Sequence, residues 1–350
     1  MDAPELTLYT EDVGTVAPPG VVALPRRPRW VISNLAYFAY QTRQARGRYR
    51  IEAWPTTDVV AFNNVLAGAG FYGMYAGPTV GFVNDYKNLR YRLTSTTVPQ
   101  RVQRGVLKRL EGRAARAATV LAVNSEFLKA MVVEEYGLCP ERVHVLYKGV
   151  NVDEFEAPYR GLPGSAEEPL RVLFAKSDWR IGGLPTLLEA VGRLAAQRAV
   201  HLRVAGTDGV AVPSVPSKAR VDFLGIVDAE RLKAELRDAH VFCTPSISEA
   251  LGVANMEAML SRVPVVATDV GGIPEVTGGG AHASQVPADD PGAIASALEG
   301  MCARPGETAR RVEAARAYVR AKFSIKQSIA GFRECCALAS ERHAKTATHL

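Results

Sequence analysis

The sequence predicts an α/β fold of two domains. Apolar runs of strand length alternate along the chain with segments whose apolar residues recur at helical spacing, which is typical of parallel sheets covered by helices. The length of 350 residues suits two domains with sizeable cores. Residues 155–168 are polar and rich in Pro and Gly, as a linker would be. We expect an N-terminal domain over 1–157, a C-terminal domain over 158–324 and a final helical segment over 325–350.

The first domain is predicted from short strands and the helices between them. Strands are expected at 6–9, 21–24, 57–64, 79–83, 119–123 and 143–147, and helices at 33–46, 98–117 and 126–133. The loop after the first strand contains Gly14 and Gly20 but is followed by no full helix, so this start is short. Asn84 and Asp85 directly follow the strand at 79–83. Polar residues at strand ends of this kind are expected to line a cleft.

Basic residues gather in the helix predicted at 98–117. Its apolar residues recur at helical spacing and place the charged side chains on other faces; they are Val98, Val102, Val106, Leu110, Ala114 and Ala117. The formal net charge of +6 is concentrated around this helix, in Arg90, Arg92, Arg101, Arg104, Lys108, Arg109, Arg113 and Arg116, opposed within that span only by Glu111. A basic face serves nucleic acid, an anionic membrane surface or a phosphorylated acceptor, or is simply solvated. We expect peripheral membrane contact through residues 98–117 and no nucleic-acid partner.

The second domain repeats the alternation of strands and helices. Strands are expected at 171–175 and 201–205 and before Gly225, with helices at 185–197 and 229–238. Further helices are expected at 291–303, 308–322 and 325–339, and the polar tail from 341 to 350 is expected to be frayed.

The stretch from Thr244 to Glu275 is the most informative part of the chain. An apolar strand at 239–243 leads through a Pro-Ser turn into a helix, and a second strand follows at 263–268. Glu249 lies just before the helix, and Glu257 lies about two turns into it. A helix N-terminus favours an anion. A nucleotide sugar matches both features, because its diphosphate suits the N–H groups and its vicinal hydroxyls suit the carboxylates.

The pattern of Glu249, seven residues and Glu257, with Pro245-Ser246 before it and Val265 to Glu275 after it, resembles GT-B fold retaining glycosyltransferases of the family-4 type. The resemblance implies two Rossmann-like domains facing each other across a cleft, with the acceptor bound by the first and the nucleotide sugar by the second. It assigns Glu249 to hydroxyls of the donor sugar and Glu257 to the ribose. It also places Gly252, with Leu251 and Val253 beside it, at the donor diphosphate.

Two further parts of the family pattern are altered here. Where the family supplies an Arg and a Lys for the diphosphate, this chain has Lys176 near the Arg position and Gly182 at the Lys position, with Arg180 between them. We expect Lys176 and Arg180 to neutralise charge on the departing nucleotide. The family's His-Asp is Asn84-Asp85 here. An amide can only hydrogen-bond, so Asn84 is expected to orient a sugar hydroxyl, while Asp85 either accepts a proton from the acceptor or caps its own segment.

Together with these observations, the resemblance implies a metal-independent, retaining transfer of a sugar from a nucleotide sugar to a hydroxyl of a sugar, lipid-linked or small-molecule acceptor. The chain has no Asp-x-Asp pair and no Cys/His cluster with zinc spacing, so no metal and no cofactor besides the donor are expected. Five scattered Cys, no leader and no long apolar run favour a cytoplasmic location, with at most peripheral membrane contact. A nucleotide-sugar 2-epimerase and a sugar-nucleotide-binding protein that has lost catalysis remain alternatives.

Overall fold

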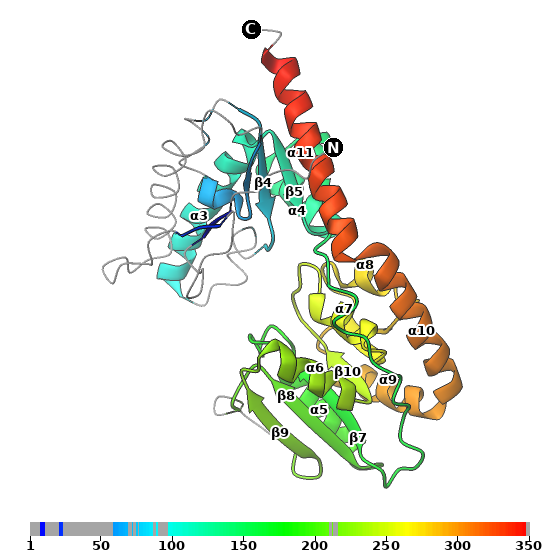
Figure 1. Ribbon diagram of the computed structural model, residues 1–350. Coiled ribbons are helices and arrows are strands. Elements are labelled where there is room, and N and C mark those ends of the chain that lie inside the picture. The colour runs from blue at the N-terminus through cyan, green and yellow to red at the C-terminus, as the bar shows by residue number, and fades with distance from the viewer. Residues whose placement is uncertain are drawn as a thin grey trace. The chain divides into compact units, whose positions relative to one another are not determined.

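The structure is a computed structural model that describes residues 8–10, 21–23, 59–68, 72, 75, 77–86, 89, 97–209, 212 and 216–347. The chain divides into two compact units (Figure 1). The first comprises Met1–Val123, Lys129–Val145 and Phe332–Leu350, and the second comprises Asn124–Leu128 and Leu146–Gly331. Every strand pairing recorded in either unit is parallel, which confirms the predicted α/β class.

The first unit is built on a parallel sheet in chain order, β3-β4-β5-β6, beside a parallel pair, β1-β2. Its elements are β1 (Leu8–Thr10), β2 (Val21–Ala23), β3 (Val60–Phe62), the 3-10 helix η2 (Val65–Gly68), β4 (Thr79–Val83), α3 (Val98–Ala117), β5 (Val120–Val123), α4 (Glu126–Tyr136) from Lys129 onward, the 3-10 helix η3 (Pro140–Arg142) and β6 (Val143–Val145). β5 is buried throughout, as its uninterrupted apolar run predicts. The helix predicted at 33–46 and the glycines Gly14 and Gly20 lie outside the described residues.

Helix α3 has the predicted bounds, but its buried face matches the predicted apolar face only in part, at Ala114. Val98, Val102 and Val106 are 71%, 64% and 38% exposed, whereas the buried residues are Leu107, Glu111, Gly112, Ala114 and Ala115. The expectation that the valines face inward is therefore wrong. Glu111 is buried because it accepts a hydrogen bond from the Tyr136 hydroxyl at 2.7 Å. The only acid of this basic helix therefore points into the protein and does not offset the exposed arginines.

The second unit is built on a six-stranded sheet in the order β12-β11-β10-β7-β8-β9. Its elements are β7 (Leu170–Ala175), α5 (Leu184–Leu194), β8 (Val200–Ala205), β9 (Arg220–Gly225), α6 (Ala229–Asp238), β10 (Val241–Thr244), α7 (Val253–Leu260), β11 (Val265–Thr268), α8 (Ile273–Thr277), β12 (Ser284–Val286), α9 (Pro291–Ala303) and α10 (Pro305–Lys322). The last helix, α11 (Ile325–Ala347), starts in this unit, and its residues from Phe332 onward belong to the first unit. From β7 the chain continues to β8 and β9 on one side, and from β10 to β11 and β12 on the other. The strand order therefore reverses between β7 and β10.

Both faces of this sheet are covered by helices, which explains why its central strands read as continuous apolar runs. Val172, Phe174 and Cys243 point into one core with α5 and α9. Leu173 and Phe242 point into a second core with α6, α7 and α10. Alternate residues of one strand thus serve opposite cores, as the two-residue repeat of a strand requires. Val150 and Phe155 pack against the second core, so the residues from Leu146 onward group with this unit.

The C-terminal part of the chain departs from prediction in three places. The sequence indicated neither α8 nor β12, because both are shorter than the pattern of apolar residues can resolve. The tail predicted to fray instead continues α11 to Ala347. Within the first unit, Arg342 donates to the Glu141 carbonyl at 2.6 Å, and the Phe332 and Phe82 rings lie 6.0 Å apart. In the part of the chain that the structure describes, no helix combines the length and the hydropathy needed to cross a membrane.

Candidate functional site

The strand order of the second unit places a candidate site where β7 and β10 lie side by side. In an open parallel sheet, ligands bind beyond the carboxyl ends of the strands at the point where the order reverses. Lys176 directly follows β7, and the loop 245–252 directly follows β10. The two segments expected to bind the donor, the one that begins at Lys176 and the loop 245–252, therefore both start at the carboxyl ends of β7 and β10.

The loop 245–252 is held on both sides by backbone hydrogen bonds. Ile247 donates to the Ile181 carbonyl at 2.9 Å, and the Glu249 carbonyl accepts from Gly272 at 3.2 Å. The Thr268 hydroxyl donates to the Ser246 carbonyl at 2.5 Å. The neighbouring Gly271 has φ +60°, and a Cβ atom there would lie 1.8 Å from the Glu249 carbonyl oxygen. Because Gly271 and Gly272 have no side chains, the chain after β11 can pass directly against the backbone of Glu249.

Lys176 and Glu249, which the sequence assigned to different parts of a donor, are brought into direct contact. The Lys176 ammonium donates to Glu249 Oε2 as an ion pair. The other carboxylate oxygen, Oε1, accepts from the Ala250 N–H at 3.1 Å. The side chains are 23% and 20% exposed, so both remain open to a ligand. The pair puts a cation and an acceptor of hydroxyl hydrogen bonds side by side.

Helix α7 begins beside this pair with an open N-terminus. Its N-cap, Gly252, supplies no side-chain hydrogen bond, so the first N–H groups are available to an anion. Two buried polar side chains flank the loop, Thr244 at 4% and Asn255 at 3% exposure. Thr244 Oγ1 and Asn255 Oδ1 have no hydrogen-bond partner among the described residues. Sequence reasoning missed both, because nothing in the pattern distinguishes them from ordinary strand and helix residues.

Glu257 lies on α7 and is partly buried. Burial raises the pKa of its carboxyl, and the nearby charges of Lys148 and Lys233 partly counter that rise. Lys233 is itself paired with Glu154 and Glu230. Within the described part of the chain, the Glu257 carboxylate makes no hydrogen bond or ion pair. A half-buried carboxylate with unused acceptors suits a hydroxyl-bearing ligand.

Replacing Glu257 by Gln is expected to raise stability at neutral pH while weakening nucleotide binding. A carboxyl whose pKa is raised in the folded state binds its proton more tightly there than in the unfolded chain, so its contribution to stability falls as the pH rises through that pKa. Glu257→Gln should therefore melt higher than the parent at pH 7, with the difference shrinking towards about pH 4. Its affinity for a nucleotide sugar should fall by about 1–3 kcal/mol in calorimetry. A variant less stable at pH 7, or one with unchanged affinity, would contradict this role.

The second expected cation, Arg180, is exposed beside the site. Its guanidinium lies 4.1 Å from the centroid of the neighbouring Trp179 ring and makes no ion pair among the described residues. Arg180 therefore carries a charge that the protein does not compensate locally. The structure does not bring it into contact with Lys176 or Glu249.

Asn84 and Asp85 are exposed at the carboxyl end of β4, in the first unit. The Asn84 amide donates to the Asn63 carbonyl at 2.6 Å, so polar residues after β3 and β4 do meet, as expected for neighbouring strand ends. The roles assigned to Asn84 and Asp85 at the reacting sugar stay predictions.

Glu275, the last acid of the family-like stretch, is used within the protein. Its carboxylate accepts from the N–H groups of Glu126 and Phe127, both at 2.9 Å, and from the Tyr147 hydroxyl at 2.8 Å. These N–H groups open α4, where a carboxylate is stabilising. Glu275 is thus a helix cap rather than a donor ligand.

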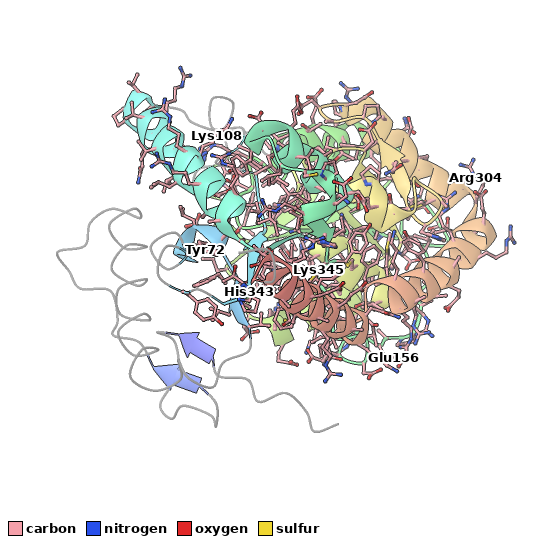
Figure 2. The ribbon with its side chains drawn as sticks, turned by 90° about the horizontal axis from the view of Figure 1, so that it is seen from above. Tyr72, Lys108, Glu156, Arg304, His343 and Lys345 are labelled. Atoms are coloured by element: carbon pink, nitrogen blue, oxygen red, sulfur yellow. The ribbon has the colours of Figure 1, made fainter. Side chains whose placement is uncertain are left out.

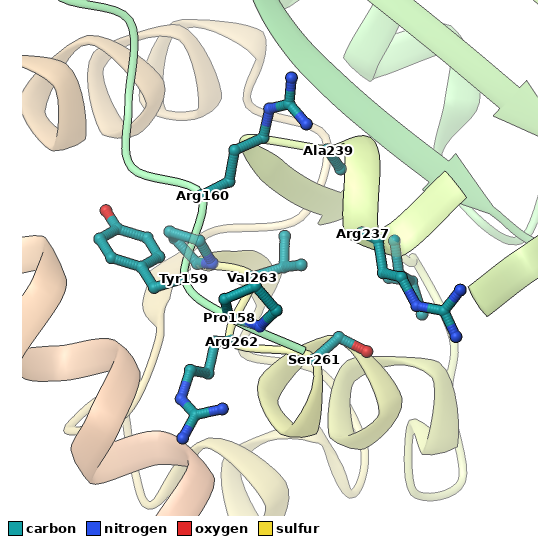
Figure 3. Close-up of a pocket in the computed structure, with 10 residues that line it drawn as sticks. Pro158, Tyr159, Arg160, Arg237, Ala239, Ser261, Arg262 and Val263 are labelled. Atoms are coloured by element: carbon teal, nitrogen blue, oxygen red, sulfur yellow. The ribbon is translucent and has the colours of Figure 1, made fainter. Parts of the chain in front are cut away.

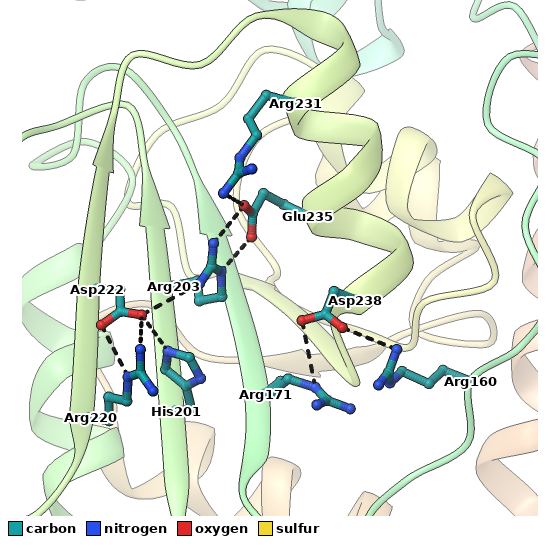
Figure 4. Close-up of polar contacts among 9 residues, drawn as sticks. All are labelled: Arg160, Arg171, His201, Arg203, Arg220, Asp222, Arg231, Glu235 and Asp238. Carbon is teal, nitrogen blue, oxygen red and sulfur yellow. Dashed lines mark hydrogen bonds and ion pairs between the residues drawn. The ribbon is translucent and has the colours of Figure 1, made fainter.

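Two other polar regions of the second unit lie away from this edge. A small hollow lined by Arg160, Arg237 and Ser261 lies beside Ala239 and Pro264, which precede β10 and β11 and so mark the opposite edge of the sheet (Figure 3). In Figure 4, Asp222 pairs with His201 at 2.8 Å, and Glu235 pairs with Arg203 and Arg231. These pairs link β8, β9 and α6, and their charges are already matched, so they stabilise the scaffold of the site.

Comparison with known proteins agrees with this architecture. The family described as "Glycosyl transferases group 1" matches residues 169–304, and "Glycosyltransferase Family 4" matches residues 4–154. The structure is similar to that of sucrose-phosphate synthase from Thermosynechococcus elongatus, with a TM-score of 0.75 and 18% identity, over 99% of this chain and 90% of that one. It is also similar to Anabaena Alr3699/HepE in complex with UDP-glucose, with a TM-score of 0.66 and 17% identity, over 94% and 86% of the chains.

Curated relatives carry the same family signal. D-inositol 3-phosphate glycosyltransferase of Streptomyces scabiei is 30% identical over 255 residues, which cover 67% of this chain and 57% of the relative. MMP alpha-(1->4)-mannosyltransferase of Mycolicibacterium hassiacum is 30% identical over 179 residues, which cover 48% of this chain and 41% of the relative. The chain thus spans about half the length of the curated relatives it matches.

The two parallel-sheet units and the likeness to solved glycosyltransferases define a GT-B type of α/β protein. With the family matches to both halves, the chain belongs to the family-4 type of GT-B glycosyltransferases.

Proposed function

We propose that this protein transfers a sugar from a nucleotide sugar to an acceptor hydroxyl, with retention of configuration and without a metal ion. The observation that carries the proposal is the grouping of Glu249, Lys176 and the open N-terminus of α7 at the point where the sheet order reverses. Glu257 on the same helix supplies a second carboxylate with unused acceptors.

Each residue has a role in this proposal. The N–H groups of Gly252 and Val253 bind the diphosphate beside Leu251, and Lys176 and Arg180 offset its charge. Glu257 accepts from the ribose hydroxyls, and Glu249 orients the donor sugar. The acceptor oxygen attacks on the face that the leaving phosphate vacates, and a phosphate oxygen takes its proton. Asn84 orients a hydroxyl in this scheme, because an amide cannot act as a base.

The experiment is a panel of UDP-, GDP-, ADP- and dTDP-sugars incubated with sugar, sugar-phosphate and lipid-linked acceptors, with the product's anomeric configuration read by NMR. Retained configuration with one donor, at a rate unchanged by EDTA, supports the proposal. An inverted product refutes retention, and a rate abolished by EDTA and restored by Mg²⁺ refutes metal independence. Appearance of a 2-epimer favours the epimerase alternative, and donor binding without turnover favours a binding protein.

We further propose that α3 contacts an anionic membrane surface that presents a lipid-linked acceptor. Five exposed residues of this helix lie along one stripe, which is apolar in its first half at Val98, Val102 and Val106 and basic in its second half at Arg109 and Arg113. Lys108, labelled on α3 in Figure 2, is paired with Glu135. An apolar segment continued by exposed arginines suits the boundary between headgroups and acyl chains.

Reversing two exposed charges is expected to weaken this contact. Each arginine near an anionic leaflet contributes about 1 kcal/mol, so Arg109→Glu with Arg113→Glu should weaken binding to vesicles containing anionic lipid by about 30-fold or more in a sedimentation assay. Arg237→Glu, an exposed charge of the second unit, is the matched control. Binding that persists in the double variant, or that is equally lost in the control, would show that α3 is only a solvated surface.

A further inference from the structure

We propose that Lys176 is a positioning residue that holds the Glu249 carboxylate in place for the donor sugar, and that residue 182 is glycine because the Lys176 side chain occupies the space beside it. The inference rests on the proposed function, since it concerns the same site. It concerns how the site is held rather than what it binds.

The contacts of Lys176 show how its side chain is directed. Its N–H donates to the Ala205 carbonyl at 3.1 Å, which fixes the backbone at the end of β7. Its ammonium donates to Glu249 Oε2. A Cβ atom on Gly182 would lie 2.9 Å from Lys176 Cγ and 3.0 Å from Lys176 Cβ. Any side chain at 182 would therefore push Lys176 off its path to Glu249.

The contacts of Glu249 show that the pair orients its carboxylate. One oxygen accepts from Lys176, the other accepts from the Ala250 N–H, and the carbonyl of the same residue accepts from Gly272. A carboxylate has about four acceptor positions, so hydroxyls of a sugar can still bind it. An ammonium has three donors, so Lys176 can contact a phosphate without releasing Glu249. The ion pair can thus persist when a donor is bound. The Lys176 ammonium would then lie between the Glu249 carboxylate and the donor diphosphate, which would otherwise repel each other.

A double-mutant cycle separates this role from that of a simple phosphate ligand. If Lys176 acts through Glu249, Lys176→Met should lower kcat by about 10–100-fold, because a displaced carboxylate no longer orients the sugar. The affinity for the free nucleoside diphosphate, read by calorimetry, should fall by a smaller factor than kcat, because Lys176 offsets only part of the diphosphate charge. In a Glu249→Gln background, Lys176→Met should cost much less of kcat than it costs in the parent protein, because the carboxylate that it positions is already gone. Lys218→Met, at an exposed lysine, is the control.

Two results would overturn the inference. The first is a double variant whose loss is the product of the two single losses, and the second is a Lys176→Met variant that loses nucleotide affinity but keeps its kcat. Either result in an active parent protein would leave the proposed function intact. A parent that transfers no sugar from any donor would instead refute the proposed function, and this inference with it.

The glycine is tested separately. Gly182→Ala should lower kcat as Lys176→Met does, but should cause a smaller further loss in a Lys176→Ala background, where Cγ, the nearer of the two Lys176 atoms, and the ammonium are missing. A Cβ at 182 would also lie 2.7 Å from the Phe174 ring, and this contact is the same in both backgrounds, so only the difference between them counts. Gly306→Ala, where a Cβ meets nothing within 4 Å, is the matched control. An equal loss of kcat in both backgrounds would overturn the steric explanation.

Discussion

Glu249→Gln should reduce sugar transfer by about 100-fold or more while leaving affinity for the free nucleoside diphosphate within about threefold. Glu249 contacts Lys176 and the N–H of Ala250 and lies beside the N-terminus of α7. With the diphosphate at that N-terminus, the sugar of the donor is expected next to Glu249. The amide keeps the size of the side chain but loses the charge that pairs with Lys176. Steady-state kinetics with the best donor, together with calorimetry of the nucleoside diphosphate, measures both effects.

The matched control for this variant is Glu299→Gln, at a carboxylate on α9 that lies 3.8 Å from Arg198, outside the proposed donor site. It should keep the parent rate. If Glu249→Gln weakened nucleotide binding as much as it slowed transfer, the carboxylate would serve the nucleotide rather than the sugar.

Gly271→Ala should destabilise the second unit by about 2–4 kcal/mol and also slow transfer. The residue has φ +60°, which an L side chain adopts at a cost, and its new methyl group would lie 1.8 Å from the Glu249 carbonyl oxygen. Relief of that overlap requires the loop 245–252 to move, together with the bond from Gly272 to Glu249. Denaturant unfolding followed by kinetics on the folded fraction measures the two effects separately.

Gly279→Ala provides the control for backbone strain alone. Gly279 has φ +64°, but a Cβ atom there meets nothing within 4 Å. It should therefore show only the smaller cost of the left-handed conformation, about 1–2 kcal/mol, with the parent rate of transfer. Equal destabilisation by both variants would mean that the chain after β11 tolerates the overlap without moving Glu249.

The sheet scaffold and the position of the site could be predicted because they depend on local patterns. The strands β7, β10 and β11 are buried at most or all positions and are apolar except for Arg171, Thr244 and Thr268, so they are easy to recognise in the sequence. Glu249 and Glu257 stand at a recognisable spacing around a strand end and a helix start. The positions of Glu249 and Glu257 follow from the order of strand, loop and helix along the chain, and that order can be read from the sequence.

What could not be predicted depends on contacts between distant segments. The pairing of Lys176 with Glu249 joins two loops that are separated by three strands and two helices in the chain. Nothing in the sequence between Thr244 and Glu275 shows that Glu275 has a different role from Glu249, yet Glu275 caps α4. The valines of α3 follow a helical period that looks like a packing face, and only the fold shows that Leu107 and Ala115 are buried instead.

The first unit is assembled from three separate stretches of sequence, the last of which begins at Phe332. The ring of Phe332 and the guanidinium of Arg342 contact residues that precede them by some two hundred positions or more. During synthesis, the first unit therefore cannot complete its packing until the whole second unit has left the ribosome. Folding of the two units is for this reason expected to finish in the reverse of their order of synthesis.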